Sequence, residues 1–389
     1  MRQKFGMKQW WKMSSGVVVA VCFAAAAVAL GAYGVMAPAA GASPVRAPLA
    51  ITTTSSVPVT EIKKEVLAET SIDGPAFSSL SDYTPSPNTY PPNSYPASVI
   101  AWTGRDAAHS LNAVYSLDGF NFNQQKVILQ QYSIARPAVL LLRNASVGTL
   151  APNLVVLAWT GSDRSHSLNV MFDVYGARQM VTFAENSFYA PALAYFKGQI
   201  WLAWTGTDSL HSLNVMAIGP NGLTPGHKTI LSGQWAGFSS RSGPALRADN
   251  GDGLLLLSWS SQSIPVYIDL AQSADGSTWS TAFSPPPPQA SGSSPDVLSI
   301  PGTVPSGLPT DYWAWTGTDP LRSLNIAYTS TLPSWPAPVV ALDEAGFGPP
   351  QLGYSTKLGL GAPNTVTILL AWTGMDASHH LNVAVIQIG

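Results

Sequence analysis

The stretch Ala101-Trp-Thr-Gly-Arg-Asp-Ala-Ala-His-Ser-Leu-Asn112 decides the fold, because something close to it occurs six times between residue 101 and the C-terminus. The tryptophans in second place are about 45 to 57 residues apart, and they are Trp102, Trp159, Trp204, Trp259, Trp315 and Trp372. This period is typical of a repeated four-stranded unit. The sequence therefore predicts a repeat protein.

Each repeat contains four short apolar segments separated by Gly, Asn, Asp and Pro turn signals. In the third repeat they are residues 190–196, 199–204, 212–217 and 228–231. Four such strands joined by tight turns form an antiparallel meander. Six meanders arranged radially make an all-β, six-bladed β-propeller, in which every blade buries its faces against its neighbours.

The last repeat ends at Gly389 after its third strand. Before the first repeat, residues 61–68 (Glu-Ile-Lys-Lys-Glu-Val-Leu-Ala) resemble the fourth strands at residues 125–129 and 227–231. We therefore expect the N-terminal strand to close the last blade, because closure removes an exposed sheet edge. The propeller is predicted to span residues 61–389.

Residues 1–42 have the composition of an export signal. The basic residues Arg2, Lys4, Lys8 and Lys12 precede an uncharged run from Val17 to Val35, and Ala40-Gly41-Ala42 matches a cleavage site. The run is also close to the ~20 residues that span a bilayer, so the segment is a signal peptide or an N-terminal membrane anchor. Residues 43–60 form a flexible linker. We expect an exported protein, secreted or anchored with the propeller outside, that meets a membrane only through this segment.

Composition excludes several partners. The formal net charge is −2 and only 10% of residues are charged, whereas a nucleic-acid-binding protein needs a basic stripe. Cys22 is the single cysteine, so no intramolecular disulfide can form. No phosphate loop or CxxC motif is present. We expect a monomer without a cofactor.

Two segments carry a family resemblance. Ser273-Ala-Asp-Gly-Ser-Thr-Trp279 resembles the short Asp box, or BNR repeat, of sialidases and related propellers, and Ser116-Leu-Asp-Gly-Phe-Asn-Phe122 is a weaker copy. The resemblance implies a sialidase-like six-bladed propeller over roughly residues 60–389, with the box between third and fourth strands as a folding element. Sialidases use an arginine triad, a Tyr/Glu pair and an acidic Asp. The nearest segment here, Ile134-Ala-Arg-Pro137, has a different order, so the catalytic residues are unknown.

The candidate site is the Gly-x-Asp-x-x-His turn between the second and third strands of each blade, on the face opposite the Asp boxes. The candidate residues are Asp106 with His109, Asp163 with His166, Asp208 with His211, Asp319 with Arg322, and Asp376 with His379. In one interpretation Asp caps the turn, and His or Arg pairs with it or with a neighbouring blade. In another the turns form a polar ring that binds sugar hydroxyls. A metal site is a poor fit, because two side chains leave most coordination positions unfilled.

Three function classes follow. The first is an extracytoplasmic carbohydrate- or surface-binding propeller without catalysis, whose partner is a glycan or another cell-surface ligand. We favour it because four histidines recur at one position, whereas a capped turn needs only the Asp. The second is a diverged sialidase-like glycoside hydrolase, since carboxylates from different blades can meet near the axis. The third is a protein-interaction scaffold.

Overall fold

The computed structural model describes residues 58–79, 96–143, 153–174, 177–219, 224–231, 238–249, 252–280, 290–300, 310–329, 339–354 and 365–389. These residues form six antiparallel sheets and no helix. None of the described segments is a helix long and apolar enough to cross a membrane. The predicted signal or anchor (1–42) and most of the linker (43–60) lie outside the described residues.

The first three blades follow one another along the chain. Blade 1 contains β2 (Ala76–Ser79), β3 (Ser98–Thr103), β4 (Ser110–Ser116) and β5 (Val127–Tyr132). Blade 2 contains β6 (Ala138–Arg143), β7 (Asn153–Thr160), β8 (Ser167–Val174) and β9 (Ala177–Asn186). Blade 3 contains β10 (Ala192–Phe196), β11 (Gln199–Thr205), β12 (Leu213–Ile218) and β13 (Pro225–Ile230).

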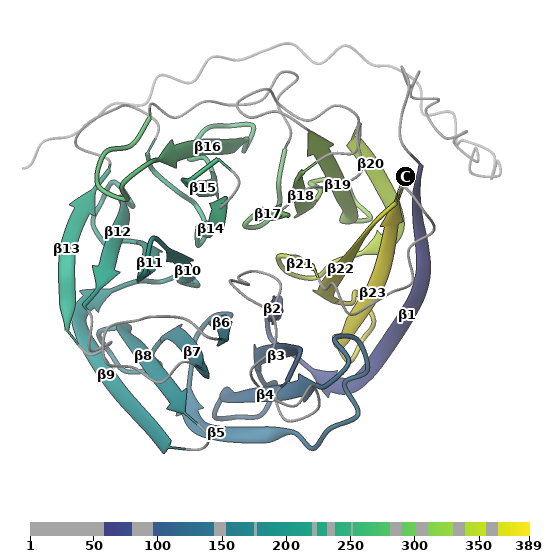
Figure 1. The fold of residues 1–389 in the computed structure, drawn as a ribbon, viewed down its shortest axis with the longest axis horizontal. Helices are drawn as coiled ribbons and strands as arrows, with labels where there is room; N and C mark the ends of the chain where they lie inside the picture. Colours follow the sequence, from purple (N-terminus) through teal and green to yellow (C-terminus); the bar gives the residue numbers. More distant parts are fainter. Residues whose placement is uncertain are drawn as a thin grey trace, which may run out of the picture. The chain divides into compact units, whose positions relative to one another are not determined.

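The remaining blades complete the ring (Figure 1). Blade 4 has three strands among the described residues, β14 (Ala245–Asp249), β15 (Leu254–Ser260) and β16 (Ile268–Ser273). Blade 5 contains β17 (Asp296–Ser299), β18 (Asp311–Thr316), β19 (Ser323–Thr329) and β20 (Val339–Ala345). Blade 6 contains β21 (Gln351–Tyr354), β22 (Val366–Thr373), β23 (His380–Ile388) and β1 (Val59–Thr70). The prediction of an all-β, six-bladed propeller is confirmed.

The N-terminal strand closes the last blade, as predicted. β1 pairs antiparallel with β23, from Val59 opposite Ile388 to Thr70 opposite His380. Figure 1 shows β1 on the outside of blade 6 and next to blade 1. The two ends of the propeller sequence are thereby held in one sheet, and the third strand of blade 6 has no free edge.

The core lies between blades. The six repeated tryptophans are at most 1% exposed, because each sits on the second strand of its blade and faces a neighbouring blade. Trp204 of blade 3, for example, packs in one apolar cluster with Val156 and Leu168 of blade 2. Large buried aromatic side chains dominate core energetics, so these contacts explain why tryptophan recurs once per repeat.

The threonine that follows each tryptophan links neighbouring blades. The Thr103 hydroxyl donates to the Ala135 carbonyl of the segment leading into blade 2, at 2.7 Å. Equivalent bonds leave Thr160, Thr205, Ser260, Thr316 and Thr373, at 2.6 to 2.7 Å. The repeated Trp-Thr pair therefore contributes one apolar and one polar contact at every junction between blades.

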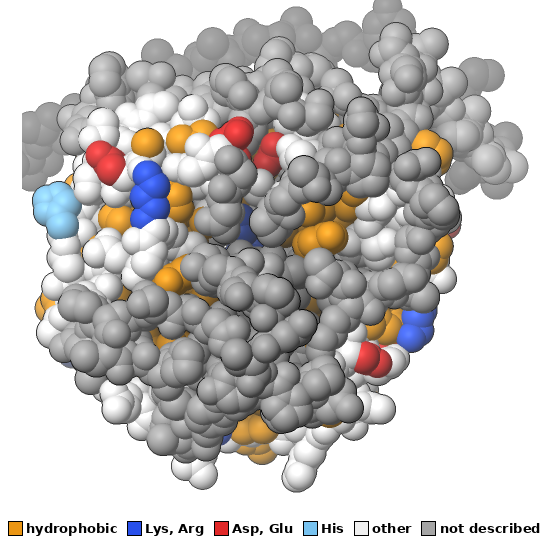
Figure 2. Space-filling view, viewed as in Figure 1, with side chains coloured by type: hydrophobic (Ala, Val, Ile, Leu, Met, Phe, Trp, Pro, Cys, Tyr) orange, Lys and Arg blue, Asp and Glu red, His pale blue; other side chains and the backbone are white. Residues whose placement is uncertain are grey.

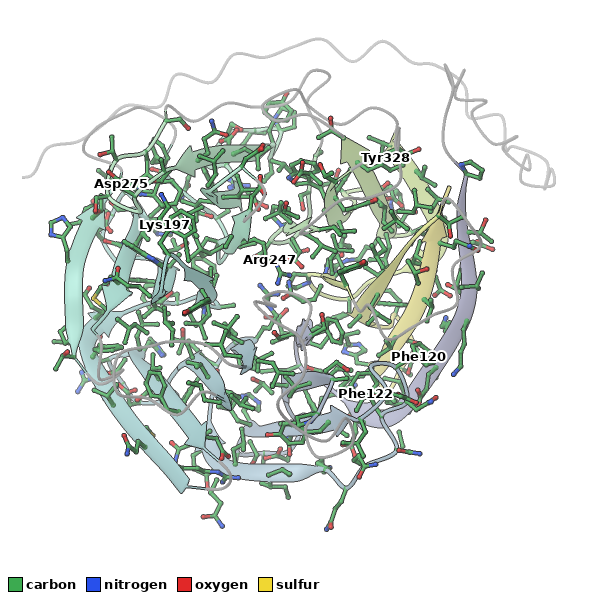
Figure 3. All side chains as sticks on the ribbon, in the orientation of Figure 1. Phe120, Phe122, Lys197, Arg247, Asp275 and Tyr328 are labelled. Carbon is green, nitrogen blue, oxygen red and sulfur yellow. The ribbon has the colours of Figure 1, made fainter. Side chains whose placement is uncertain are left out.

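The two segments that resemble Asp boxes form compact turns. Asp275 accepts hydrogen bonds from the amides of Ser277 and Thr278, at 2.8 and 2.7 Å, and the buried Trp279 ring donates from Nε1 to the Gly276 carbonyl. These amide bonds lower the pKa of Asp275 to about 2. Figure 3 shows Asp275 far from the axis, where Arg247 lies. The assignment to the Asp-box family itself stays a prediction.

Candidate functional site

In the five intact repeats the Asp carboxylate caps its own turn. Asp106 accepts hydrogen bonds from the amides of Ala108 and Ser110 and from the Ser110 hydroxyl, at 3.0 to 3.3 Å. The same bonds occur at Asp163, Asp208, Asp319 and Asp376, with a histidine in place of the serine at Asp376. Partial burial raises the pKa of Asp106, but these hydrogen bonds outweigh it and lower the pKa overall.

The residue three positions after each Asp, a histidine in four blades and Arg322 in blade 5, has a left-handed backbone conformation that the turn requires. His109 has a φ of 55°, and φ is 53°, 50°, 53° and 56° at His166, His211, Arg322 and His379. Its amide donates to the Asp106 carbonyl, and its own carbonyl accepts from Ser133, which follows the fourth strand. A left-handed residue is therefore required at this position, and histidine tolerates that conformation better than most side chains.

One interpretation paired the histidine or arginine at i+3 with its Asp or with a neighbouring blade, and the hydrogen bonds of the described residues include none between the two side chains of one turn. In blade 6 the partner is the next residue, because His380 Nδ1 lies 2.8 Å from Asp376 Oδ1. The i+3 side chains instead reach aromatic rings of the segments between blades. His379 packs on Phe347, with ring centroids 3.8 Å apart, and the Arg322 guanidinium lies 5.7 Å from the same ring. His166 contacts Phe188 in a similar way, at 5.3 Å.

A second polar arrangement lies at the outer strands, where two blades meet. In three of the junctions a Lys of one blade pairs with a Glu of the preceding blade. The pairs are Lys126 with Glu69 at 2.8 Å, Lys228 with Glu185 at 2.6 Å, and Lys64 with Glu344. The ammonium groups of Lys64 and Lys228 also lie 5.2 and 5.3 Å from the rings of Trp372 and Trp204. These two pairs thus lie over a repeated tryptophan.

Two of these junctions contain grooves, which we call the seam grooves. The first has a volume of about 430 Å³ and is lined by Glu69, Thr70, Trp102, Gly104, Arg105, Asp106, Ser110, Asn112, Lys126 and Ile128. The second has a volume of about 370 Å³ and is lined by Lys64, Val66, Glu344, Ala345, Trp372, Gly374, Met375, Asp376, His380 and Asn382. The two sets match position by position around the ring, so the grooves are repeats of one site.

The seam grooves contain part of the predicted site. Asp106 and Asp376 line them, whereas His109 and His379 are not among the lining residues. The asparagine six residues after each Asp also lines a groove; Asn112 Nδ2 donates to the Ser110 carbonyl at 2.8 Å. A Cβ on Gly104 would come within 2.6 Å of the Asp106 carboxylate, so this close turn needs glycine there.

Sequence reasoning missed the lysines, the glutamates and the asparagine. For the lysine and the asparagine, a repeated pattern in the sequence could have indicated them. The lysine stands three residues before the buried leucine of the fourth strand, as in Lys126 and Leu129. The asparagine is repeated at Asn112, Asn169, Asn214, Asn325 and Asn382. What the repeats do not indicate is that the lysine and the glutamate of one groove come from different blades.

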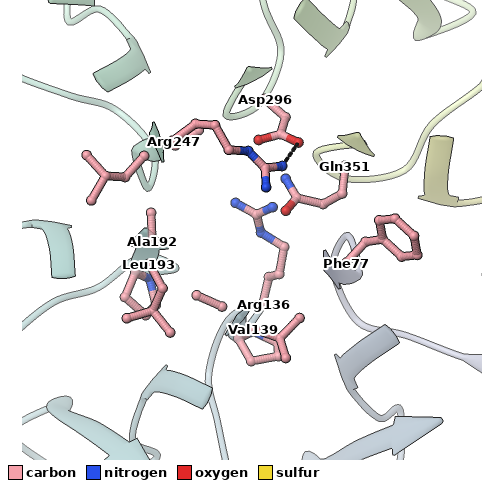
Figure 4. Close-up of a pocket in the computed structure, with 13 residues that line it drawn as sticks. Phe77, Arg136, Val139, Ala192, Leu193, Arg247, Asp296 and Gln351 are labelled. Atoms are coloured by element: carbon pink, nitrogen blue, oxygen red, sulfur yellow. Dashed lines mark ion pairs between the residues drawn. The ribbon is translucent and has the colours of Figure 1, made fainter. Parts of the chain in front are cut away.

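A third polar cluster lies at the axis, where the first strands of the blades meet. Figure 4 shows the guanidinium groups of Arg136 and Arg247 directed toward the same space, beside Asp296 and Gln351. Asp296 is buried; burial raises its pKa, and the nearby Arg247 opposes the rise. Among the described residues that line this cavity there is no glutamate and no tyrosine. A two-carboxylate glycosidase mechanism needs a second acidic group beside the first.

Two further features of the described residues are the distribution of surface charge and possible metal-binding clusters. On the face drawn in Figure 2, charged side chains of both signs are scattered among the coloured residues. Within the described part of the chain, no three His, Cys, Asp or Glu side chains are grouped closely enough to hold a metal ion.

The chain matches no protein-family model and no curated protein. It is similar in structure to a protein of unknown function from Dyadobacter fermentans, at 12% identity and a TM-score of 0.54, covering 85% of this chain and 99% of that one. Weaker likenesses are the fucose-specific lectin from Aleuria aurantia (12% identity, TM-score 0.47, 83% and 97% covered) and the parainfluenza virus 5 hemagglutinin-neuraminidase ectodomain (10%, 0.46, 86% and 84%). At 12% identity, the likeness to the Dyadobacter fermentans protein shows a shared fold alone.

Proposed function

We propose that the protein is an exported, non-catalytic propeller that binds neutral carbohydrates in its seam grooves. The observation that carries the proposal is the repetition of one groove, with a Lys–Glu pair from two blades, a tryptophan beneath it, and an Asp and an Asn at the rim. A purely structural ion pair would not require the open space beside it.

The chemistry of the grooves suits sugar hydroxyls. Each hydroxyl can donate to the carboxylates of Glu69 and Asp106 and accept from the ammonium of Lys126, all of which line the first groove. The groove volumes fall within the range of small-molecule sites, roughly 300–1,000 Å³. The buried ring of Trp102 forms part of the floor of this groove.

Charge balance favours a neutral ligand. The first groove holds two cationic side chains, Arg105 and Lys126, and two carboxylates, Glu69 and Asp106. The second holds one lysine, two carboxylates and His380. Neither groove has a cationic excess that would select a phosphate or a sugar acid. Hexoses without a charged substituent are therefore the ligands we propose.

Several weak sites on one molecule can bind a multivalent ligand more tightly than each site does alone. The third Lys–Glu junction, Lys228 with Glu185, repeats the pair beside Trp204 in blade 3, whose turn between second and third strands carries Asp208. Several sites on one rigid ring can engage one displayed glycan surface and raise the overall avidity without new contacts. The turns that carry Asp163 with His166 and Asp319 with Arg322 remain part of the proposed ring of contacts.

A glycan array probed with the full-length protein, run beside a panel of chromogenic glycosides, tests the proposal. We expect retention on neutral glycans and no release of chromophore. Release of chromophore would support the glycoside hydrolase instead. Absence of retention on every glycan, combined with capture of a protein from the same cell surface, would support the interaction scaffold.

A further inference from the structure

The residues at the axial cavity differ between blades, whereas those of the seam grooves repeat. The residue after the proline that opens each first strand is alanine in blades 1 to 4, but it is Asp296 in blade 5 and Gln351 in blade 6. Arg136 precedes that proline in blade 2, and Arg247 lies on β14 of blade 4. Four polar side chains from four blades therefore enter an otherwise small and apolar space (Figure 4).

Arg247 bonds to neighbouring blades through its Nε and Nη2 atoms. Its Nε donates to the Val297 carbonyl and its Nη2 to the Leu352 carbonyl, both at 3.0 Å. The same Nη2 lies 3.7 Å from Asp296 Oδ2, which accepts from the Leu352 amide at 2.7 Å. Arg247 and Asp296 thus bind blades 4, 5 and 6 to one another.

Arg136 has no such partners. Its side chain is 3% exposed, and its Nε is buried without a hydrogen-bond partner among the described residues. Its backbone amide, not its guanidinium, donates to Asp73 at 3.2 Å. Burial lowers the pKa of Arg136, and the charges of Asp73 and Asp296 oppose that effect. A buried guanidinium is unfavourable unless it is paired and hydrogen-bonded.

The cavity in front of Arg136 is small. Its volume is about 30 Å³, whereas one water needs at least roughly 10–15 Å³ by this measure. The wall carries two guanidinium groups and one carboxylate, with Ala138, Ala192 and other apolar side chains around them. A water could accept a hydrogen bond from Nε, but it carries no charge to pair with the guanidinium, and the ion pairs of the described residues include none to Arg136.

We propose that the axial cavity binds one small monovalent anion, of the size of a halide or formate, between Arg136 and Arg247. The anion would pair with the guanidinium that has no partner, and the space excludes a sugar ring. Because residues of all six blades line the cavity, the bound anion would stabilise the closed ring. The site is independent of the proposed carbohydrate grooves, which lie at the outer strands.

The test measures the melting temperature of the full-length protein in increasing sodium chloride, with sodium gluconate as the bulky-anion control at matched ionic strength. We expect the melting temperature to rise by a few degrees with the logarithm of chloride concentration and to stay level in gluconate. Arg136→Met removes the buried charge and should fold, because the charge it removes has no partner. This variant should lose the chloride effect, whereas Arg241→Met, at an exposed position, should keep it.

Crystals grown in sodium bromide provide an independent readout on the parent protein. An anomalous peak within hydrogen-bonding distance of Arg136 Nε is the expected result. If sodium formate raises the melting temperature of the parent protein as sodium chloride does, that result also supports a small-anion site. The proposal is overturned if chloride and gluconate act alike on the parent, if Arg136→Met keeps the chloride effect, or if only a larger sugar acid stabilises the protein.

Discussion

The hydroxyl of Thr103 donates a hydrogen bond to the carbonyl of Ala135, and so joins the second strand of blade 1 to the segment that enters blade 2. The buried hydroxyl is 0% exposed, and the same relationship recurs at all six junctions. The ring is therefore held by polar as well as apolar contacts, and each polar contact can be removed separately.

Thr103→Val tests the value of one such bond. The substitution keeps the shape of the side chain but removes its donor, so we expect a loss of about 1 kcal/mol in the free energy of unfolding. Ala135 keeps one acceptor bond from the Ser133 hydroxyl, which limits the loss. Urea unfolding measures the change. Thr103→Ser keeps the donor and is the control; equal loss in both variants would show that packing, not the bond, is responsible.

Closure by β1 predicts a cooperative effect of truncation. Removing residues 43–70 deletes a strand that pairs with β23 along its length, and it exposes the edge of blade 6. The buried Leu67 is lost with it. We expect a lower melting temperature and aggregation on heating. The closure model fails if the truncated protein melts cooperatively at the parent temperature.

The left-handed turn residues give a matched pair of variants. His109 is exposed and has no aromatic ring partner among the described residues, unlike His379, so His109→Gly mainly removes the cost of a positive φ. We expect it to stabilise the protein by up to ~1 kcal/mol. His379→Gly removes the contact with Phe347 as well and should gain less or lose stability. Chemical denaturation compares the two. Equal gains would mean that the aromatic contact contributes nothing.

Asp311 predicts a pH dependence of stability. Burial raises the pKa of Asp311 to about 6, and its Oδ1 has no hydrogen-bond partner among the described residues. A raised pKa in the folded state means that its stabilising contribution is present below the unfolded pKa near 4 and is lost as pH rises through 6.

Asp311→Asn removes that loss. We expect the variant to be more stable than the parent at pH 7, by about 1–3 kcal/mol, and similar to it at pH 4. Urea midpoints across this range measure the difference. A constant difference between the two proteins at all pH values would show that Asp311 does not titrate in this range.

The fold could be predicted from the repeats because the same residue types pack at the same positions in every blade. The tryptophan marks the second strand in each copy, and the resemblance of residues 61–68 to other fourth strands predicted the closure. Blade 4 shows the limit of this reasoning. Its motif has lost the Asp and the His, yet β15 and β16 still pair as in other blades, because Trp259 and the apolar pattern remain.

The candidate site could be predicted only in part. Spacing within one turn identified Asp106 and its equivalents, but it could not show that the repeated histidine has a backbone role, since φ is not visible in a sequence. Lys64 and Glu344 are 280 residues apart, and only the closed ring brings them together. The sequence drew attention to Arg136 through the segment Ile134–Pro137, but not to its meeting with Arg247 at the axis, because Arg247 belongs to no repeated motif.

The most direct test of the account is the retention of the full-length protein on the neutral glycan that binds best, measured for groove variants and matched controls. Lys126→Met with Lys228→Met removes the ammonium groups of two junctions, while Lys63→Met with Lys197→Met removes two exposed charges that line neither groove. Each of these two control lysines makes a surface contact, since Lys63 donates to Asn121 and Lys197 to the Ala274 carbonyl, and such exposed contacts contribute only about 0–1 kcal/mol.

Because avidity multiplies weak sites, we expect the Lys126 and Lys228 double variant to lose at least about tenfold in apparent affinity. Each single variant should lose less, and the Lys63 and Lys197 control should bind like the parent. Parent-like binding by the double groove variant, at unchanged melting temperature, would contradict the assignment of the seam grooves as the carbohydrate sites.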